Sequence, residues 1–95
     1  IVVKLLKVIN MTVKEILEKA IDTYGKQGQV DVAIEEMSEL TQALLHERRD
    51  REHNIAEELA DVEIMCKQLE MIFDCEPEVK FFVNKKLNRL KERLE

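Results

Sequence analysis

Two pairs of carboxylates in this 95-residue sequence have the i, i+3 spacing that places two side chains on one face of a helix. The first pair is Glu36 and Glu39, and the second is Glu58 and Asp61. On a helical wheel each pair lies beside apolar neighbours rather than on a wholly charged side. If the two helices form an antiparallel hairpin about a turn near residues 48–49, the pairs lie level with one another.

Four carboxylates brought this close together repel one another. Two unit charges about 4 Å apart repel by about 4 kcal/mol at an effective dielectric constant near 20. Hard divalent cations prefer oxygen ligands, and Mg²⁺, or Mn²⁺ in its place, would compensate this charge. Mg²⁺ commonly keeps several waters while it binds a few carboxylates and the phosphates of a substrate. The chemistry that such a site suits is metal-assisted hydrolysis of a phosphoanhydride.

The composition favours an all-α fold. Two glycines and one proline are too few for the many turns of a β-sandwich or barrel, whereas helix-forming residue types dominate. With 45% hydrophobic and 37% charged residues, the chain does not have the composition of a disordered tail. We therefore expect one domain over residues 11–95, preceded by an N-terminal extension at residues 1–10.

Four amphipathic helices are expected, because apolar side chains recur at helical spacing. The first begins after Thr12, which forms a capping-box pattern with Glu15. Asn54 with Glu57 is expected to cap the third helix, and Pro77 suits the first turn of the fourth. The expected helices cover residues 13–24, 30–46, 55–73 and 79–95, with turns at 26–28 and 47–53 and a break at 74–77.

The main apolar stripes of the second and third helices are expected to form the core. They consist of Val30, Ile34, Met37, Thr41, Leu44 and Leu45, and of Ile55, Leu59, Val62, Cys66, Leu69 and Phe73. The third helix also carries Ala60, Ile64 and Met71 on another side, and a helix that is apolar on two sides is usually buried on two sides. We therefore expect a four-helix bundle completed by oligomerisation, as a homodimer or tetramer.

The acid pairs resemble the EExxE and ExxD signature of the MazG-like all-α nucleotide pyrophosphohydrolases. Glu35, Glu36 and Glu39 match EExxE, and Glu58 and Asp61 match ExxD after 18 intervening residues. The resemblance extends from about residue 11 to the end of the chain. It implies a Mg²⁺-dependent enzyme that converts a nucleoside triphosphate, NTP or dNTP, and water into the monophosphate and pyrophosphate.

The same resemblance implies roles for individual residues. Glu36, Glu39, Glu58 and Asp61 would be the metal ligands, and Glu35 would be a catalytic group that orients water or accepts its proton. The substrate-binding candidates are Gln29, Lys85, Lys86, Asn88 and Arg89, of which the last four lie on the basic final helix.

Charge and cysteine usage limit the possible partners and compartment. The net charge of -5 argues against a nucleic-acid polymer as partner. No apolar run approaches the roughly 20 residues that a membrane span needs. Cys66 and Cys75 have neither metal-finger spacing nor a disulfide framework, which suits a reducing, cytoplasmic compartment.

Several other interpretations of the acids remain open. They could form a solvated helix surface, or only organise the oligomer of a non-catalytic helical interaction module. A phosphoribosyl-ATP pyrophosphohydrolase-like or dUTPase-like relative would carry similar acids. A dinuclear iron bundle is disfavoured, because it needs Glu-x-x-His and the residues three before His46 and His53 are Ala43 and Asp50.

Overall fold

The computed structural model describes residues 11–95, so the expected extension at residues 1–10 lies outside the described residues. The described part is all-helical, with four helices and no strand, as the composition predicts. In chain order the helices are α2 (Val13–Tyr24), α3 (Lys26–Arg48), α4 (Ile55–Ile72) and α5 (Glu76–Leu94). None of the four is both long and apolar enough to cross a membrane.

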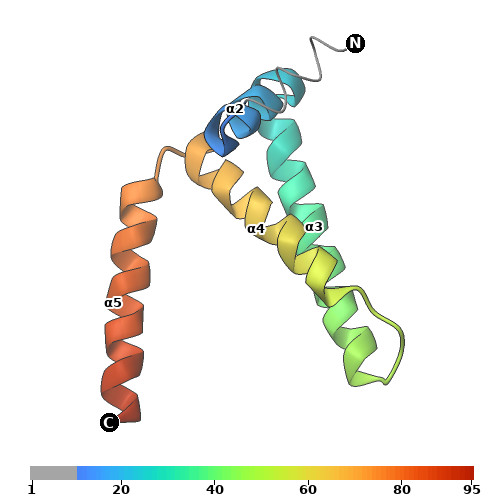
Figure 1. The fold of residues 1–95 in the computed structure, drawn as a ribbon, viewed down its shortest axis with the longest axis vertical. Helices are drawn as coiled ribbons and strands as arrows, with labels where there is room; N and C mark the ends of the chain where they lie inside the picture. Colours follow the sequence, from blue (N-terminus) through green and yellow to red (C-terminus); the bar gives the residue numbers. More distant parts are fainter. Residues whose placement is uncertain (1–10) are drawn as a thin grey trace.

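An antiparallel hairpin of α3 and α4 dominates the arrangement (Figure 1). Helix α2 lies across the open end of this hairpin and contacts both of its helices. Helix α5 extends away from the end of α4, with a wide separation from the hairpin along most of its length. The three helices α2 to α4 thus form one packed unit, and α5 forms an arm.

The start of α2 and the α2/α3 junction are set by two local features. The Thr12 Oγ1 accepts a hydrogen bond of 3.1 Å from the Glu15 amide, which confirms the expected cap. Gly25 has φ +84°, a conformation that residues with a Cβ rarely adopt, and α3 begins directly after it. The expected turn at residues 26–28 is wrong, because Gly25 alone makes the turn and Gly28 lies inside α3.

Helices α3 and α4 end in the same backbone motif. At the end of α3 the Arg51 amide bonds the His46 carbonyl at 2.9 Å and the Asp50 amide bonds the Glu47 carbonyl at 3.1 Å. These are the two bonds of a Schellman motif, which needs a left-handed residue after the helix. Asp50 supplies it with φ +54°, and Asp74 does so after α4 with φ +48°.

The interior of the hairpin differs from the expected core. The buried apolar residues are Leu17, Ile21, Ala33, Ala43 and Met65, and the buried polar residues are Gln29, Glu58 and Gln68. Large residues of the expected stripes are exposed, among them Ile34, Met37, Leu44, Leu45 and Leu59. The expectation was wrong because the acid-bearing face of α3, where alanines allow close approach, turns toward α4. The large apolar stripes are left uncovered by the part of the chain that the structure describes.

Candidate functional site

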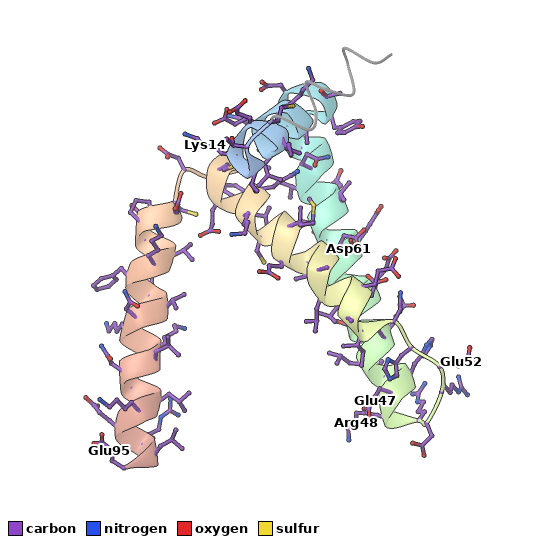
Figure 2. All side chains as sticks on the ribbon, viewed as in Figure 1. Lys14, Glu47, Arg48, Glu52, Asp61 and Glu95 are labelled. Atoms are coloured by element: carbon purple, nitrogen blue, oxygen red, sulfur yellow. The ribbon has the colours of Figure 1, made fainter. Side chains whose placement is uncertain are left out.

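The α3/α4 hairpin brings the two acid pairs together midway along its length. The Glu36 carboxyl lies against that of Asp61, and the Glu39 carboxyl lies against that of Glu58. This is the level arrangement that an antiparallel hairpin predicts. Figure 2 shows Asp61 midway along the hairpin, away from the turn that carries Glu52.

Three of the four acids converge closely enough to share one ion. Glu36, Glu58 and Asp61 each offer a carboxylate oxygen, and these oxygens lie within 4.8 Å of one another. Glu58 is the most buried of the three, with 6% of its surface exposed, and the other two are half-buried. The cluster is therefore partly shielded from solvent while one side remains open.

Asn54 holds one oxygen of Glu58. Its side-chain Nδ2 donates a hydrogen bond of 2.8 Å to Glu58 Oε1. Asn54 is the N-cap residue of α4, as expected, but its side chain makes no capping hydrogen bond to the α4 backbone, so the expected capping pattern with Glu57 is not formed. The amide instead orients the most buried carboxylate of the cluster.

The second oxygen of Glu58 and one oxygen of Glu36 have no such partner. Glu58 Oε2 and Glu36 Oε2 are both buried and make no hydrogen bond within the described part of the chain. A buried polar atom without a partner costs about 1 to 3 kcal/mol, and more when it is charged. These two atoms are therefore suited to a ligand that residues 11–95 do not supply.

The electrostatics of the cluster agree with its geometry. The pKa of Glu36 is raised above its ordinary value, first by burial and then by the negative charges of Glu39 and Asp61. The pKa of Glu39 is raised first by the charge of Glu58 and then by partial desolvation. The charged neighbours that raise both pKa values are all carboxylates. The site thus concentrates negative charge that a cation would relieve.

These residues fit a hard divalent cation. Carboxylate oxygens are the ligands that Mg²⁺ and Mn²⁺ prefer, and a site built from a few carboxylates leaves positions for waters and phosphates. The hydrogen bond to Glu58 Oε1 leaves Oε2 free to coordinate. Outer hydrogen bonds of this kind usually orient metal-binding carboxylates.

The other expected residues on α3 lie at different distances from the cluster. Glu39 is exposed at its edge, coupled to Glu58. Glu35 is exposed and contributes to the charge around Glu39. Gln29 is buried on the same helix, seven residues before Glu36, which corresponds to about 10.5 Å along the axis. Glu39 therefore lies close enough to join the site, Glu35 lies beside Glu39 on the exposed side, and Gln29 is too far along the helix axis to touch the same ion.

The structure does not bring the basic candidates to the cluster. Lys85, Lys86, Asn88 and Arg89 are all exposed on α5. Figure 2 shows the end of this helix, marked by Glu95, far from Asp61. Within one chain, therefore, the acids and the expected phosphate-binding cations are separate.

The two larger surface pockets lie away from the acid cluster. A hollow of about 460 Å³ between α2 and the end of α4 is lined by charged residues such as Lys14, Asp22 and Glu70, and by none of the four acids. Another, of about 470 Å³, lies near the end of α3 beside Leu44 and Leu45. Among residues 11–95, therefore, the acid cluster is an open site on one side of the hairpin, and none of these pockets encloses it.

Two polar residues on the acid-bearing side of the hairpin are not predicted from the sequence. Asn54 is exposed, and its position four residues before Glu58, on the same side of α4, is the sequence signal of their contact. Gln68 is only 4% exposed, and its Oε1 makes no hydrogen bond in the described chain. Its position seven residues after Asp61 places it on the acid-bearing face.

Comparison with protein-family models, with curated proteins and with solved structures gives no match to this chain.

Proposed function

We propose that this chain is a Mg²⁺-dependent nucleoside triphosphate pyrophosphohydrolase of the MazG-like kind. It would convert an NTP or dNTP and water into the monophosphate and pyrophosphate. The proposal joins the motif resemblance to one structural observation. That observation is the convergence of Glu36, Glu58 and Asp61 from two helices, with two buried carboxylate oxygens left unpartnered.

Different residues of the chain would have different roles in this reaction. Glu36, Glu58 and Asp61, joined by Glu39, would hold Mg²⁺, or Mn²⁺ in its place. Bound there, the ion would supply neutralisation of phosphate charge and activation of water. Asn54 keeps Glu58 oriented through the 2.8 Å hydrogen bond.

The hydrolysis forms one bond and breaks one. The water oxygen attacks the α phosphorus, the bond from that phosphorus to its bridging oxygen breaks, and pyrophosphate leaves. Glu35, exposed beside Glu39, would orient the water and accept its proton. Gln29 and the α5 residues Lys85, Lys86, Asn88 and Arg89 remain candidates for binding the substrate.

The proposal includes assembly and location. The uncovered apolar stripes support a bundle completed by a second copy, as a dimer or tetramer. Two free cysteines, Cys66 and Cys75, suit the cytoplasm, where thiols stay reduced.

A nucleotide panel with Mg²⁺ and chromatography of the products tests the proposal. Monophosphate and pyrophosphate are expected, and phosphoribosyl-ATP and dUTP belong in the panel because the acids do not fix the base or sugar. Glu36→Gln should abolish turnover while the helical circular-dichroism signal persists. Glu63→Gln is the matched control, since Glu63 is exposed on α4 and lies opposite the acid-bearing face. Only diphosphate and orthophosphate as products, or no metal-dependent turnover, would reject the proposal.

A non-catalytic helical interaction module is the second candidate. The observation that favours it is the large number of exposed apolar side chains on all four described helices, because contiguous apolar surface marks a binding face. In such a module divalent cations would leave the melting temperature unchanged. The metal titration described in the Discussion therefore separates the two candidates.

A further inference from the structure

Helix α5 is a separate arm in the single chain. None of its 19 residues is buried, and its main contact is with the end of α4. Figure 1 shows it running away from the α3/α4 hairpin without packing on it. Most of the stability of a helix in a protein comes from packing of its amphipathic face rather than from intrinsic propensity, so α5 is expected to need a surface to pack on.

Hydrogen bonds fix the backbone at the junction between α4 and α5, residues 73–75. The Cys75 amide bonds the Glu70 carbonyl at 3.0 Å, and the Asp74 amide bonds the Met71 carbonyl at 3.3 Å. Apolar side chains of both helices, including Leu69, meet in a hollow of about 280 Å³ at the same place. With these contacts in place α5 points away from its own hairpin (Figure 1), so its sides are accessible to another molecule.

The arm carries an apolar stripe of its own. It consists of Val79, Val83, Leu87, Leu90 and Leu94, which share one side of the helix. All except Val79 are exposed, and Leu94 is 79% exposed. The hairpin offers uncovered apolar residues in return, among them Met37, Leu44 and Leu59. Each surface therefore lacks the partner that the other could provide.

The extent of uncovered surface fits an extensive interface between copies. A compact protein of 11.2 kDa exposes about 5,700 Å², whereas this chain exposes 8062 Å². The excess of roughly 2,400 Å² is about three times the ~800 Å² that each partner of a standard interface buries. The radius of gyration agrees, at 16.9 Å against about 12 Å for a compact chain of this length.

Charge distinguishes the arm from the rest of the chain. Residues 11–75 contain 16 acidic and 7 basic residues, whereas residues 76–95 contain 4 acidic and 6 basic residues. On a helical wheel, basic residues lie on both sides of the apolar stripe: Lys86, Arg93, Arg89 and Lys85 on one side, Lys80 and Lys91 on the other. An arm with this pattern complements an acidic hairpin with an apolar stripe, since opposite potentials attract across an interface.

We propose that α5 is an exchanged arm, which packs through its apolar stripe on the α3/α4 hairpin of a second copy and brings its basic side chains to that copy's acid cluster. Each site would then combine acids of one chain with cations of the other. This explains why, among residues 11–95, no pocket wall and no basic side chain is found beside the acid cluster. The packing of α5 on a second copy does not depend on the proposed function. A phosphate-binding role of the basic side chains does rest on the proposed function.

Energy transfer between copies tests the exchange without any activity measurement. In a Cys66→Ala, Cys75→Ala background, one batch of chains is labelled with a donor at Glu92→Cys and another with an acceptor at Ser38→Cys. Both positions are exposed, one near the end of α5 and one beside the acids. Sensitised emission is expected when the batches are mixed. The opposite result would be no transfer between the two batches, but transfer in chains that carry both labels and are diluted with excess unlabelled chain. That result would show that α5 folds back on its own hairpin, and it would overturn the proposal.

Substitutions in the arm give a second test. Leu87→Glu with Leu90→Glu should abolish transfer between copies and yield monomers in light scattering. Asn84→Glu is the control, because it adds a charge to the polar side of the same helix and should leave the assembly intact. Circular dichroism of residual helix shows whether each variant is folded. A folded double variant that keeps the wild-type mass and transfer would overturn the proposal.

Mixing two inactive variants tests the shared site. One chain carries Glu36→Gln and Glu58→Gln with an intact arm, and the other carries Lys85→Ala, Lys86→Ala and Arg89→Ala with intact acids. If the cations act on the partner, the mixture regains turnover that neither parent shows. The mixture could also stay inactive while the wild type is active and the mixed chains show energy transfer. That result would overturn the role of the arm in the site. An inactive wild type whose chains still show transfer would instead reject the proposed function and leave the exchange standing.

Discussion

Asn54 Nδ2 lies 2.8 Å from Oε1 of Glu58, one helical turn further along the chain, and fixes the most buried carboxylate of the acid cluster. The amide donates this hydrogen bond to one carboxylate oxygen and thereby holds the Glu58 side chain in position. Its partner oxygen Oε2 is left free. The N-cap residue of α4 is thereby part of the proposed metal site, through a side chain that does not bond the helix backbone.

Replacing Asn54 should weaken metal binding without removing a ligand. Loss of an outer hydrogen bond usually lowers metal affinity by about 10-fold to 100-fold, because the carboxylate is no longer held in position. We expect Asn54→Ala to do so for Mn²⁺ in calorimetric titration. Asn84→Ala, on the exposed arm, is the control. Equal affinities for Asn54→Ala and wild type would show that the hydrogen bond does not support a metal site.

Divalent cations should stabilise the folded protein. An ion that binds only the folded state adds about 2.7 kcal/mol at a concentration 100 times its dissociation constant. Mg²⁺ or Mn²⁺ should therefore raise the melting temperature, and Glu58→Gln should remove most of the increase. Glu63→Gln should retain it. If neutralising both Glu58 and Asp61 left the response unchanged, they would not be ligands.

The metal-free protein should lose stability as the pH rises from mildly acidic to neutral. The pKa values of Glu36 and Glu39 are raised above 4.5 in the folded state, so both carboxyls bind protons more tightly there than in the unfolded chain. Their stabilising contribution is complete below about 4.5 and is lost as the pH passes the folded values. Urea unfolding between pH 4.5 and 7.5, at fixed protein concentration and with a chelator, measures this. Glu36→Gln with Glu39→Gln should flatten the slope, and a wild-type stability that rises over this range would contradict the expectation.

A charge in place of Ile64 should weaken assembly. Ile64 is 48% exposed on α4, on the opposite side from Leu59, so both flanks of this helix are apolar and uncovered. Ile64→Glu is expected to shift the mass in light scattering toward the monomer. Ile64→Leu keeps the apolar surface and should keep the wild-type mass. A wild-type monomer at high micromolar concentration would refute assembly itself.

Glycine at the end of α3 should stabilise the hairpin. Asp50 has φ +54°, and the left-handed conformation costs an L residue about 1 to 2 kcal/mol, less for aspartate. Asp50→Gly should therefore raise the free energy of unfolding by about 0.5 to 1 kcal/mol in chemical denaturation. Asp50→Ala, which loses the charge but keeps a Cβ, should give no such gain. If Asp50→Gly and Asp50→Ala raised the free energy of unfolding equally, the gain would come from the loss of the Asp50 charge.

The positions of the helices were largely predictable because they depend on local signals. The Thr12 cap and the apolar periodicity located α2, and the 74–77 break located the α4/α5 junction. The start of α3 was missed because Gly28 was interpreted as part of a turn. A glycine inside a helix and a glycine in a turn look alike in sequence, and only the backbone angle of Gly25 separates them.

The faces of the helices were harder to assign than their positions. Periodicity shows which residues share a side, but it does not show what covers that side. The α3/α4 contact uses Ala33, Ala43 and polar residues, whereas large residues such as Ile34 stay exposed. The spacing of the acids was informative, because a simple hairpin register sufficed to place Glu36 near Asp61.

The four acids lie within 26 consecutive residues, on two helices joined by one short turn. Contacts this local form early in folding, because little chain entropy is lost in closing the loop. Metal binding should therefore be a property of each hairpin and independent of protein concentration. An exchanged arm, in contrast, must find a second molecule. Dilution should thus reduce turnover while leaving metal affinity unchanged, which separates the formation of the ion site from the formation of the complete site.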